Sequence, residues 1–312
     1  MPTEIPLPPG IHERCVDVDG VATHYLEGGA EGPPLLLLHG NTGDAFDWIA
    51  VLGSLAANRR VLALDLPGYG RTPPLEDVSP QGFARFALAF AAAVELDRFD
   101  VVGHSLGGMM AVLMARAAPD RLRSMVLVCS GGLGRATNPI QILLGRPGVR
   151  RVALAAGLLP GGALVSTVVG ALYAARQPWR IPALWYREHL ERSRIPQFAA
   201  TSLAVIGNIT TLLGQRYDFR PELSHLRLPT LAVWGIGDPI TPAWQARSAR
   251  LVPGGSYRML PAGHYPHLED AGRFTAIVES FLQEPAAPPD GETPQHQPEA
   301  ASATPGRAAR SN

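Results

Sequence analysis

The stretch FDVVGHSLGGMM, which spans Phe99–Met110, decides how the rest of the chain is interpreted. Its apolar beginning predicts a short buried strand, and the run from Met109 to Ala118 predicts a helix. Between them lies the pattern G-x-S-x-G, in which Gly103 and Gly107 flank Ser105 at a turn too sharp for bulky neighbours. A strand, a sharp turn and a helix in this order present a serine hydroxyl at the carboxyl end of a strand. Ser105 is therefore the candidate nucleophile.

The segments on both sides of this motif alternate between strands and helices. Two strand-like runs around Asp19-Gly20 predict a hairpin, and the unbroken apolar runs after it predict buried strands. This alternation is typical of an α/β fold on a parallel sheet with right-handed crossovers. The predicted strands include Leu35–Leu38, Arg60–Leu64, Ser124–Cys129, Thr230–Trp234 and Ser256–Leu260. The predicted helices include Ala45–Ala57, one from Ser79 to about Leu96, Ala243–Leu251 and Tyr265–Leu282.

The alternation stops between about Leu133 and Leu228, where several helices but no buried strand are predicted. We expect residues 133–228 to form a helical cap, inserted into a core of residues 11–132 and 229–284 and lying over the carboxyl edge of the sheet. Residues 1–10 are expected to be a flexible N-terminus. Residues 285–312 are rich in proline and alanine and are expected to be a disordered tail.

One part of this insertion is apolar enough to raise the question of a membrane. Between Arg151 and Arg176, 24 residues carry no formal charge, a length that could cross a bilayer. Pro160-Gly161-Gly162 divides the segment, so two short apolar helices that line a pocket are favoured over a transmembrane span. Peripheral contact with a membrane is compatible with the same pattern.

Composition narrows the classes of partner. The 312 residues carry 27 basic and 27 acidic side chains, a balance that gives no electrostatic case for binding nucleic acid. The N-terminus has neither a basic start nor an apolar core, so no signal peptide is predicted and a cytoplasmic location is expected. Because no metal-ligand cluster or Walker-type loop is present in the sequence, no cofactor is expected.

A serine hydroxyl needs a base, and the base needs an orienting group. His264 follows the last predicted strand, so it belongs to the same edge of the sheet as Ser105. Asp238 lies 26 residues earlier, in the loop after Thr230–Trp234, and is the candidate acid. The loop after Ser124–Cys129, the alternative place for the acid, contains no carboxylate. The expected oxyanion donors are the backbone N–H groups of Leu106 and Asn41.

These motifs resemble the α/β-hydrolase superfamily in its cap-bearing branch. The resemblance rests on residues between about 33 and 284, and it implies an eight-stranded fold, the triad Ser105–Asp238–His264 and oxyanion donors at Asn41 and Leu106. The motifs that carry it are HGN (His39–Asn41), DLPGYG (Asp65–Gly70), GHSLGG (Gly103–Gly108), GIGD (Gly235–Asp238) and GHYPHLED (Gly263–Asp270).

Three functions compete. The apolar insertion favours a serine hydrolase for carboxylic esters of lipophilic small molecules. The loop Ser130–Gly134 resembles that of carbon–carbon bond hydrolases acting on ring-cleavage diketo acids, but those enzymes usually place tryptophan after the base, where this chain has Tyr265. They also use a cap arginine, for which Arg176, Arg180 and Arg187 are candidates. A non-catalytic binding protein is disfavoured by the intact triad. Dehalogenase and epoxide hydrolase chemistry is disfavoured because Ser105 stands where those enzymes use aspartate.

Overall fold

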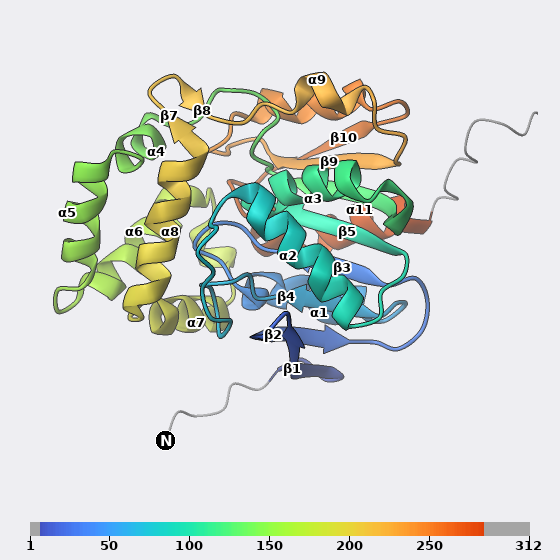
Figure 1. Ribbon diagram of the computed structural model, residues 1–312, viewed down its shortest axis with the longest axis horizontal. Helices are drawn as coiled ribbons and strands as arrows, with labels where there is room; N and C mark the ends of the chain where they lie inside the picture. Colours follow the sequence, from blue (N-terminus) through green and yellow to red (C-terminus); the bar gives the residue numbers. More distant parts are fainter. Residues whose placement is uncertain (1–6, 284–312) are drawn as a thin grey trace, which may run out of the picture.

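An eight-stranded sheet forms the centre of the computed structural model, which describes residues 7–283 (Figure 1). Two pairings, β1–β2 and β2–β4, are antiparallel and the other five are parallel. The predicted mostly parallel, eight-stranded α/β fold is confirmed. In spatial order the strands are β1 (Ile11–Val18), β2 (Val21–Gly28), β4 (Val61–Leu64), β3 (Leu35–Leu38), β5 (Phe99–His104), β6 (Leu122–Val128), β9 (Thr230–Gly235) and β10 (Ser256–Leu260).

Helices cover both faces of this sheet, which explains why its central strands are apolar throughout. Leu36 and Leu38 pack in the core beneath α2 (Pro80–Ala93) and α3 (Leu106–Ala117). Leu35 and Leu37 point to the opposite face, because successive side chains of a strand alternate. The helices on that opposite face are α1 (Ile49–Leu55) and α11 (Ala271–Gln283).

Three predicted helices differ in detail from those observed. The first divides into a 3₁₀ turn, η1 (Ala45–Trp48), and α1, and the segment Ala243–Leu251 is a 3₁₀ helix, η4. The last divides into α10 (Pro266–Glu269) and α11, because Asp270 leaves helical geometry at φ −139° and ψ 54°. The predicted tail, residues 285–312, and the first six residues of the predicted flexible N-terminus lie outside the described residues.

Between β6 and β9 the chain leaves the sheet and forms a group of helices at one end of the molecule (Figure 1). A two-residue-per-strand hairpin, which the sequence did not predict, interrupts the helical segment. The break at Pro160-Gly161 occurs where predicted, with Gly161 at φ 82°. The elements are α4 (Pro139–Leu144), α5 (Pro147–Gly157), α6 (Gly162–Ala174), η3 (Pro178–Arg180), α7 (Ala183–Ser193), α8 (Pro196–Ile209), β7 (Thr210–Thr211), β8 (Gly214–Gln215) and α9 (Arg220–Leu223).

Helix α7 is attached to the core by a buried group of charges. The Arg192 guanidinium pairs with the carboxylates of Asp44 and Asp47, and the Trp185 indole N–H donates to Asp47 Oδ1 at 2.8 Å. One cation thus faces two carboxylates in the protein interior. Burial raises the pKa of Asp47 to about 7, because the charge of Arg192 offsets only part of the penalty and the Asp44 carboxylate adds to it. Asp47 therefore holds a proton in the folded protein below about pH 7.

This raised pKa predicts a pH-dependent effect of Asp47→Asn. An unfolded aspartate titrates near pH 4, so between about pH 4 and about pH 7 Asp47 is protonated in the folded state and ionised in the unfolded state. The free energy of unfolding of the native protein therefore falls as pH rises through this range. Asparagine cannot ionise, so we expect the melting temperature of the variant, relative to the native protein, to increase between about pH 5 and about pH 8. Thermal unfolding followed by circular dichroism measures this difference, with exposed Asp120→Asn as the control for lost charge. An equal offset at both pH values would contradict it.

Candidate active site

Ser105 occupies a strained turn between β5 and α3. Its backbone has φ 52° and ψ −108°, a conformation that residues with a side chain rarely adopt. The turn is held because Ser105 N–H donates to Val128 O at 2.9 Å, while Ser105 O accepts from the N–H of Gly131 at 3.1 Å. A Cβ on Gly103 would lie 2.2 Å from Gly107 O, and one on Gly107 would lie 2.2 Å from Leu38 O. Both flanking glycines are therefore required by close contact with the backbone.

Asp238 and His264 meet at the ends of β9 and β10. His264 Nδ1 lies 2.8 Å from Asp238 Oδ2, which also accepts from the Thr241 hydroxyl at 2.7 Å. Burial acts to raise the pKa of Asp238, but His264 and hydrogen bonds from Thr241 and Ile240 outweigh it and lower the pKa. Asp238 is therefore ionised and orients the imidazole, which leaves Nε2 as the nitrogen with a free electron pair.

The His264 loop is held by residues that the sequence analysis did not assign. His264 N–H donates to Ala174 O at the end of α6, at 2.7 Å. His104 Nε2 lies 2.8 Å from His264 O, and Glu269 Oε1 accepts from Gly263 N–H at 2.8 Å. The sequence places Glu269 and His104 inside quoted motifs, but nothing in their spacing indicates these partners.

The two residues predicted to supply the oxyanion donors, Leu106 and Asn41, line the same cavity as Ser105. Leu106 is the first residue of α3, so its N–H has no acceptor within the helix and lies at the positive end of the helix dipole. Asn41 lies in the loop after β3, where its side chain bridges two elements: Oδ1 accepts from the Tyr69 hydroxyl at 2.5 Å and Nδ2 donates to Ser202 O at 3.2 Å. Asn41 therefore joins the core to α8.

Cys129 lies behind the Asp238–His264 pair, and its sulfur could complete a three-ligand group whose atoms lie within 4.8 Å of one another. Burial, together with the Asp238 carboxylate, raises the pKa of the Cys129 thiol well above its usual range. Metals bind the thiolate, and the other two groups are already joined by the contact between His264 Nδ1 and Asp238 Oδ2.

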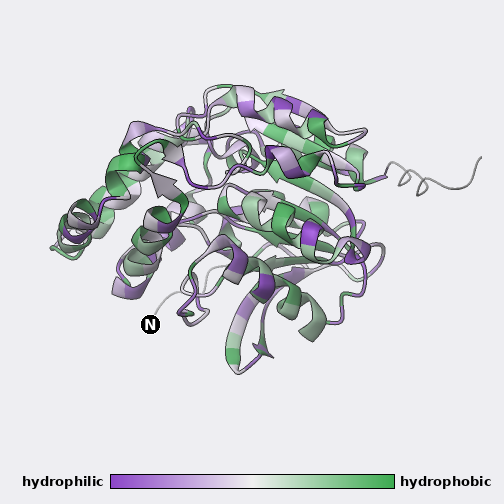
Figure 2. Ribbon diagram, turned by 45° about the horizontal axis from the view of Figure 1, so that its top comes forward, coloured by the Kyte–Doolittle hydropathy of each residue, from purple (hydrophilic) through white to green (hydrophobic). Residues whose placement is uncertain are grey.

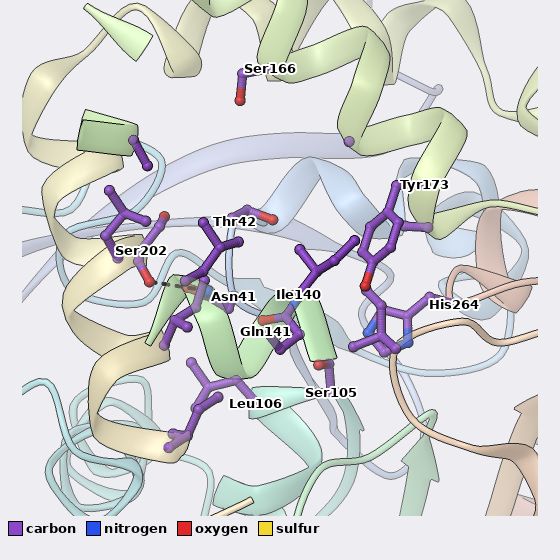
Figure 3. Close-up of a pocket in the computed structure, with 18 of the residues that line it drawn as sticks. Asn41, Thr42, Ser105, Leu106, Ile140, Gln141, Ser166, Tyr173, Ser202 and His264 are labelled. Atoms are coloured by element: carbon purple, nitrogen blue, oxygen red, sulfur yellow. Dashed lines mark hydrogen bonds between the residues drawn. The ribbon is translucent and has the colours of Figure 1, made fainter. Parts of the chain in front are cut away.

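A cavity of about 490 Å³ brings these residues together (Figure 3). Ser105, Leu106, Asn41 and His264 line it, whereas Asp238 lies behind His264. Figure 3 shows the Tyr173 hydroxyl directed towards His264, and burial raises the pKa of Tyr173 to about 12, so this hydroxyl is a hydrogen-bond donor. Helices α4 to α8 supply most of the wall, with side chains such as Ile140, Ala153, Val165, Trp185 and Ile206.

The side chains that line the cavity carry little charge. Within residues 7–283, no aspartate, glutamate, lysine or arginine lines the cavity. His189 lines it, but burial and the nearby charge of Arg192 lower the pKa of His189 well below its usual range, so its ring is neutral. The polar groups that remain are hydroxyls and amides, such as those of Ser166, Ser202 and Gln141.

Comparison with known proteins identifies relatives that match most of this chain. The dihydrolipoyllysine-residue acetyltransferase component of an acetoin cleaving system from Pseudomonas putida is 32% identical over 281 residues, which cover 86% of this chain and 68% of that protein. A 2-hydroxy-6-oxononadienedioate/2-hydroxy-6-oxononatrienedioate hydrolase from Paraburkholderia xenovorans is 27% identical over 284 residues, 86% of this chain and 93% of that protein.

Solved structures and a family model agree with this result. A structure described as a bacterial membrane phospholipase A matches with a TM-score of 0.72 and 26% identity, covering 88% of this chain and 86% of that one. The model of the alpha/beta hydrolase family matches residues 35–277, which include every strand of the sheet except β1 and β2, together with the insertion. The chain therefore belongs to the alpha/beta hydrolase family and is a hydrolase.

Proposed function

We propose that this hydrolase uses Ser105, His264 and Asp238 as a triad to cleave carboxylic esters of lipophilic small molecules. The observation that carries the proposal is the uncharged wall of the cavity beside Ser105 and His264. An acyl or alkyl chain that leaves water for such a wall gains about 25 cal/mol per Å² of buried apolar surface. A carboxylate would lose its hydration there without meeting a cation.

The proposed mechanism assigns one role to each of these groups. His264 Nε2 takes the proton of the Ser105 hydroxyl, and the serine oxygen attacks the ester carbon. The N–H groups of Leu106 and Asn41 stabilise the negative oxygen of the tetrahedral intermediate. His264 then protonates the departing alcohol, and water releases the acyl group from Ser105 by the same steps. Residues 133–228 act as the cap that shapes the acyl or alcohol subsite.

Carbon–carbon bond hydrolysis is the second candidate function. It is favoured by the relative from Paraburkholderia xenovorans and by Gly131, which lines the cavity and belongs to the loop Ser130–Gly134. However, none of Arg176, Arg180 and Arg187 lines the cavity, so none supplies the cation that a diketo acid would need. Tyr265 still stands in place of tryptophan. A non-catalytic binding role, the third hypothesis, is not supported, because the relatives above include a named hydrolase.

A fluorophosphonate probe tests the nucleophile. Such probes react with a serine that a neighbouring base activates, so we expect stoichiometric labelling of the native protein and none of Ser105→Ala. Ser130→Ala is a matched control, because Ser130 is a buried serine of the neighbouring loop whose hydroxyl donates to Gly131 O. Labelling that survives the loss of Ser105 would refute the mechanism. Intact-mass spectrometry measures the adduct.

The role of the acid is tested by Asp238→Asn. The amide keeps the shape of the side chain but cannot stabilise the imidazolium, so kcat on a nitrophenyl ester should fall about 10⁴-fold. The melting temperature should be measured in parallel, because a loss of activity through unfolding would lower both. Exposed Asp97→Asn is the control for lost charge. A fall in kcat of less than about tenfold would remove Asp238 from the triad.

The substrate class is tested with nitrophenyl esters of increasing acyl length beside a vinylogous diketo acid. We expect kcat/KM to rise with chain length until the cavity is filled, and no turnover of the diketo acid. Rapid cleavage of the diketo acid would select the second candidate function instead.

A cavity-filling variant sharpens this test. Gly170 lines the cavity in α6 and a side chain there would meet no atom within 4 Å, so Gly170→Leu should shift the preferred chain to a shorter one. Gly272→Leu in α11 is the matched control, because this glycine is equally open but lies on the core. An unchanged length profile in Gly170→Leu would show that the acyl chain binds elsewhere.

A further inference from the structure

Helices α5 and α6 expose an apolar surface at the outer end of the molecule (Figures 1 and 2). Leu164, Val168 and Leu172 form a stripe at four-residue spacing along α6, on the side opposite the cavity-lining Ser166 and Tyr173. Together with three residues of α5 and the α5–α6 turn, they make what we call the α5–α6 surface. Its members are between 43% and 70% exposed and are Val152, Leu158, Leu159, Leu164, Val168 and Leu172.

The segment that carries this surface is strongly basic. Residues 133–228 contain twelve arginines but only four aspartates and glutamates, a net charge of +8 in a chain whose total charge is zero. Arg146, Arg150 and Arg151 lie in or next to the first turns of α5, and within the described residues no carboxylate oxygen lies within 4.0 Å of them. Arg150 donates to Leu203 O of α8, on the inner side of α5, and Arg146 donates to Ile142 O. Arg151 is exposed and directly precedes Val152, so its charge lies next to the apolar surface.

We propose that the α5–α6 surface docks on an anionic lipid bilayer, from which the lipophilic substrate of the proposed function reaches the cavity. Apolar side chains flanked by arginines suit the boundary between acyl chains and anionic headgroups. Two copies of this surface placed against each other would bring together two segments of net positive charge, which disfavours a second copy as the occupant.

The inner sides of the same helices form the wall of the cavity. Ala153 and Gly157 of α5 and Val165 and Val169 of α6 line it. A single layer of helices therefore separates the proposed bilayer contact from Ser105. The contact is peripheral, because no single helix within residues 7–283 is long and apolar enough to cross a bilayer. Helices α5 and α6 reach the apolar length of a transmembrane span only when they are counted together. The angle between the two helices is 117°, so they do not form one continuous span.

Vesicle flotation tests the docking surface. The full-length protein should float with vesicles of phosphatidylcholine and phosphatidylglycerol, bind weakly to phosphatidylcholine alone, and lose affinity for the anionic vesicles as salt is added. Leu159→Asp/Leu172→Asp should reduce binding at least tenfold, because two exposed leucines no longer enter the bilayer and two negative charges are added. Arg151→Gln should reduce binding to anionic vesicles about fivefold.

Two controls make the result decisive. Leu251→Asp/Trp244→Asp changes two apolar residues of η4 that are 45% and 52% exposed on the core, and it should leave vesicle binding unchanged. Size-exclusion chromatography with light scattering gives the oligomeric state of each variant. Failure of the native protein to bind anionic vesicles, or equal losses in the surface and control variants, would overturn the proposal. A dimer that dissociates in Leu159→Asp/Leu172→Asp would also overturn it, in favour of a second copy as the occupant.

The docking proposal rests on the proposed function, but the two can fail separately. Flotation of Ser105→Ala protein measures docking without hydrolysis, and a short soluble nitrophenyl ester measures hydrolysis without docking. Intact flotation with no hydrolysis of any ester would refute the proposed function alone. Hydrolysis of the soluble ester without vesicle binding would refute the docking alone. If both proposals hold, Leu159→Asp/Leu172→Asp should lower the rate on a long-chain ester dissolved in vesicles and leave the rate on the soluble ester unchanged.

Discussion

The structure depends on one backbone conformation, that of Ser105 at φ 52°. An L-residue is held there only where its surroundings leave no alternative, and costs about 1–3 kcal/mol. Here the surroundings are the packing of Gly103 against Gly107 and of Gly107 against Leu38, which lock β5, α3 and β3 together. The same contacts place Ser105 at the carboxyl edge of the sheet. The loops that carry Asp238 and His264 begin at this edge, after β9 and β10.

Much of this arrangement could be predicted because parallel strands leave a simple pattern. Leu35–Leu38 is apolar throughout because both faces of β3 are covered, and the carboxyl ends of neighbouring parallel strands share an edge. That rule alone brings the loops of Asp238 and His264 together. Helix boundaries were less predictable, since Asp270 leaves helical geometry inside a stretch whose apolar pattern predicts one continuous helix.

The supports of the site could not be predicted for a physical reason. Arg192 reaches Asp47 across 145 residues, and His104 reaches the carbonyl of His264 across 160. Single polar side chains at such separations follow no periodicity. The apolar run between Arg151 and Arg176 was also predicted only in part. Helices α5 and α6 line the cavity on one side, as expected, but they expose leucines and valines on the other side.

The insertion is joined to the core unequally. Buried charges fasten α7, whereas α6 reaches the site through the hydrogen bond from His264 N–H to Ala174 O. The C-terminal end of α6 thus holds the loop of His264, the proposed base. The stripe of Leu164, Val168 and Leu172 on the same helix faces solvent. Thermodynamic linkage makes this connection reciprocal. If a ligand that binds the stripe shifts α6, it changes the affinity of the site for a ligand that contacts the His264 imidazole. Binding of that second ligand then changes the affinity of the stripe by the same factor.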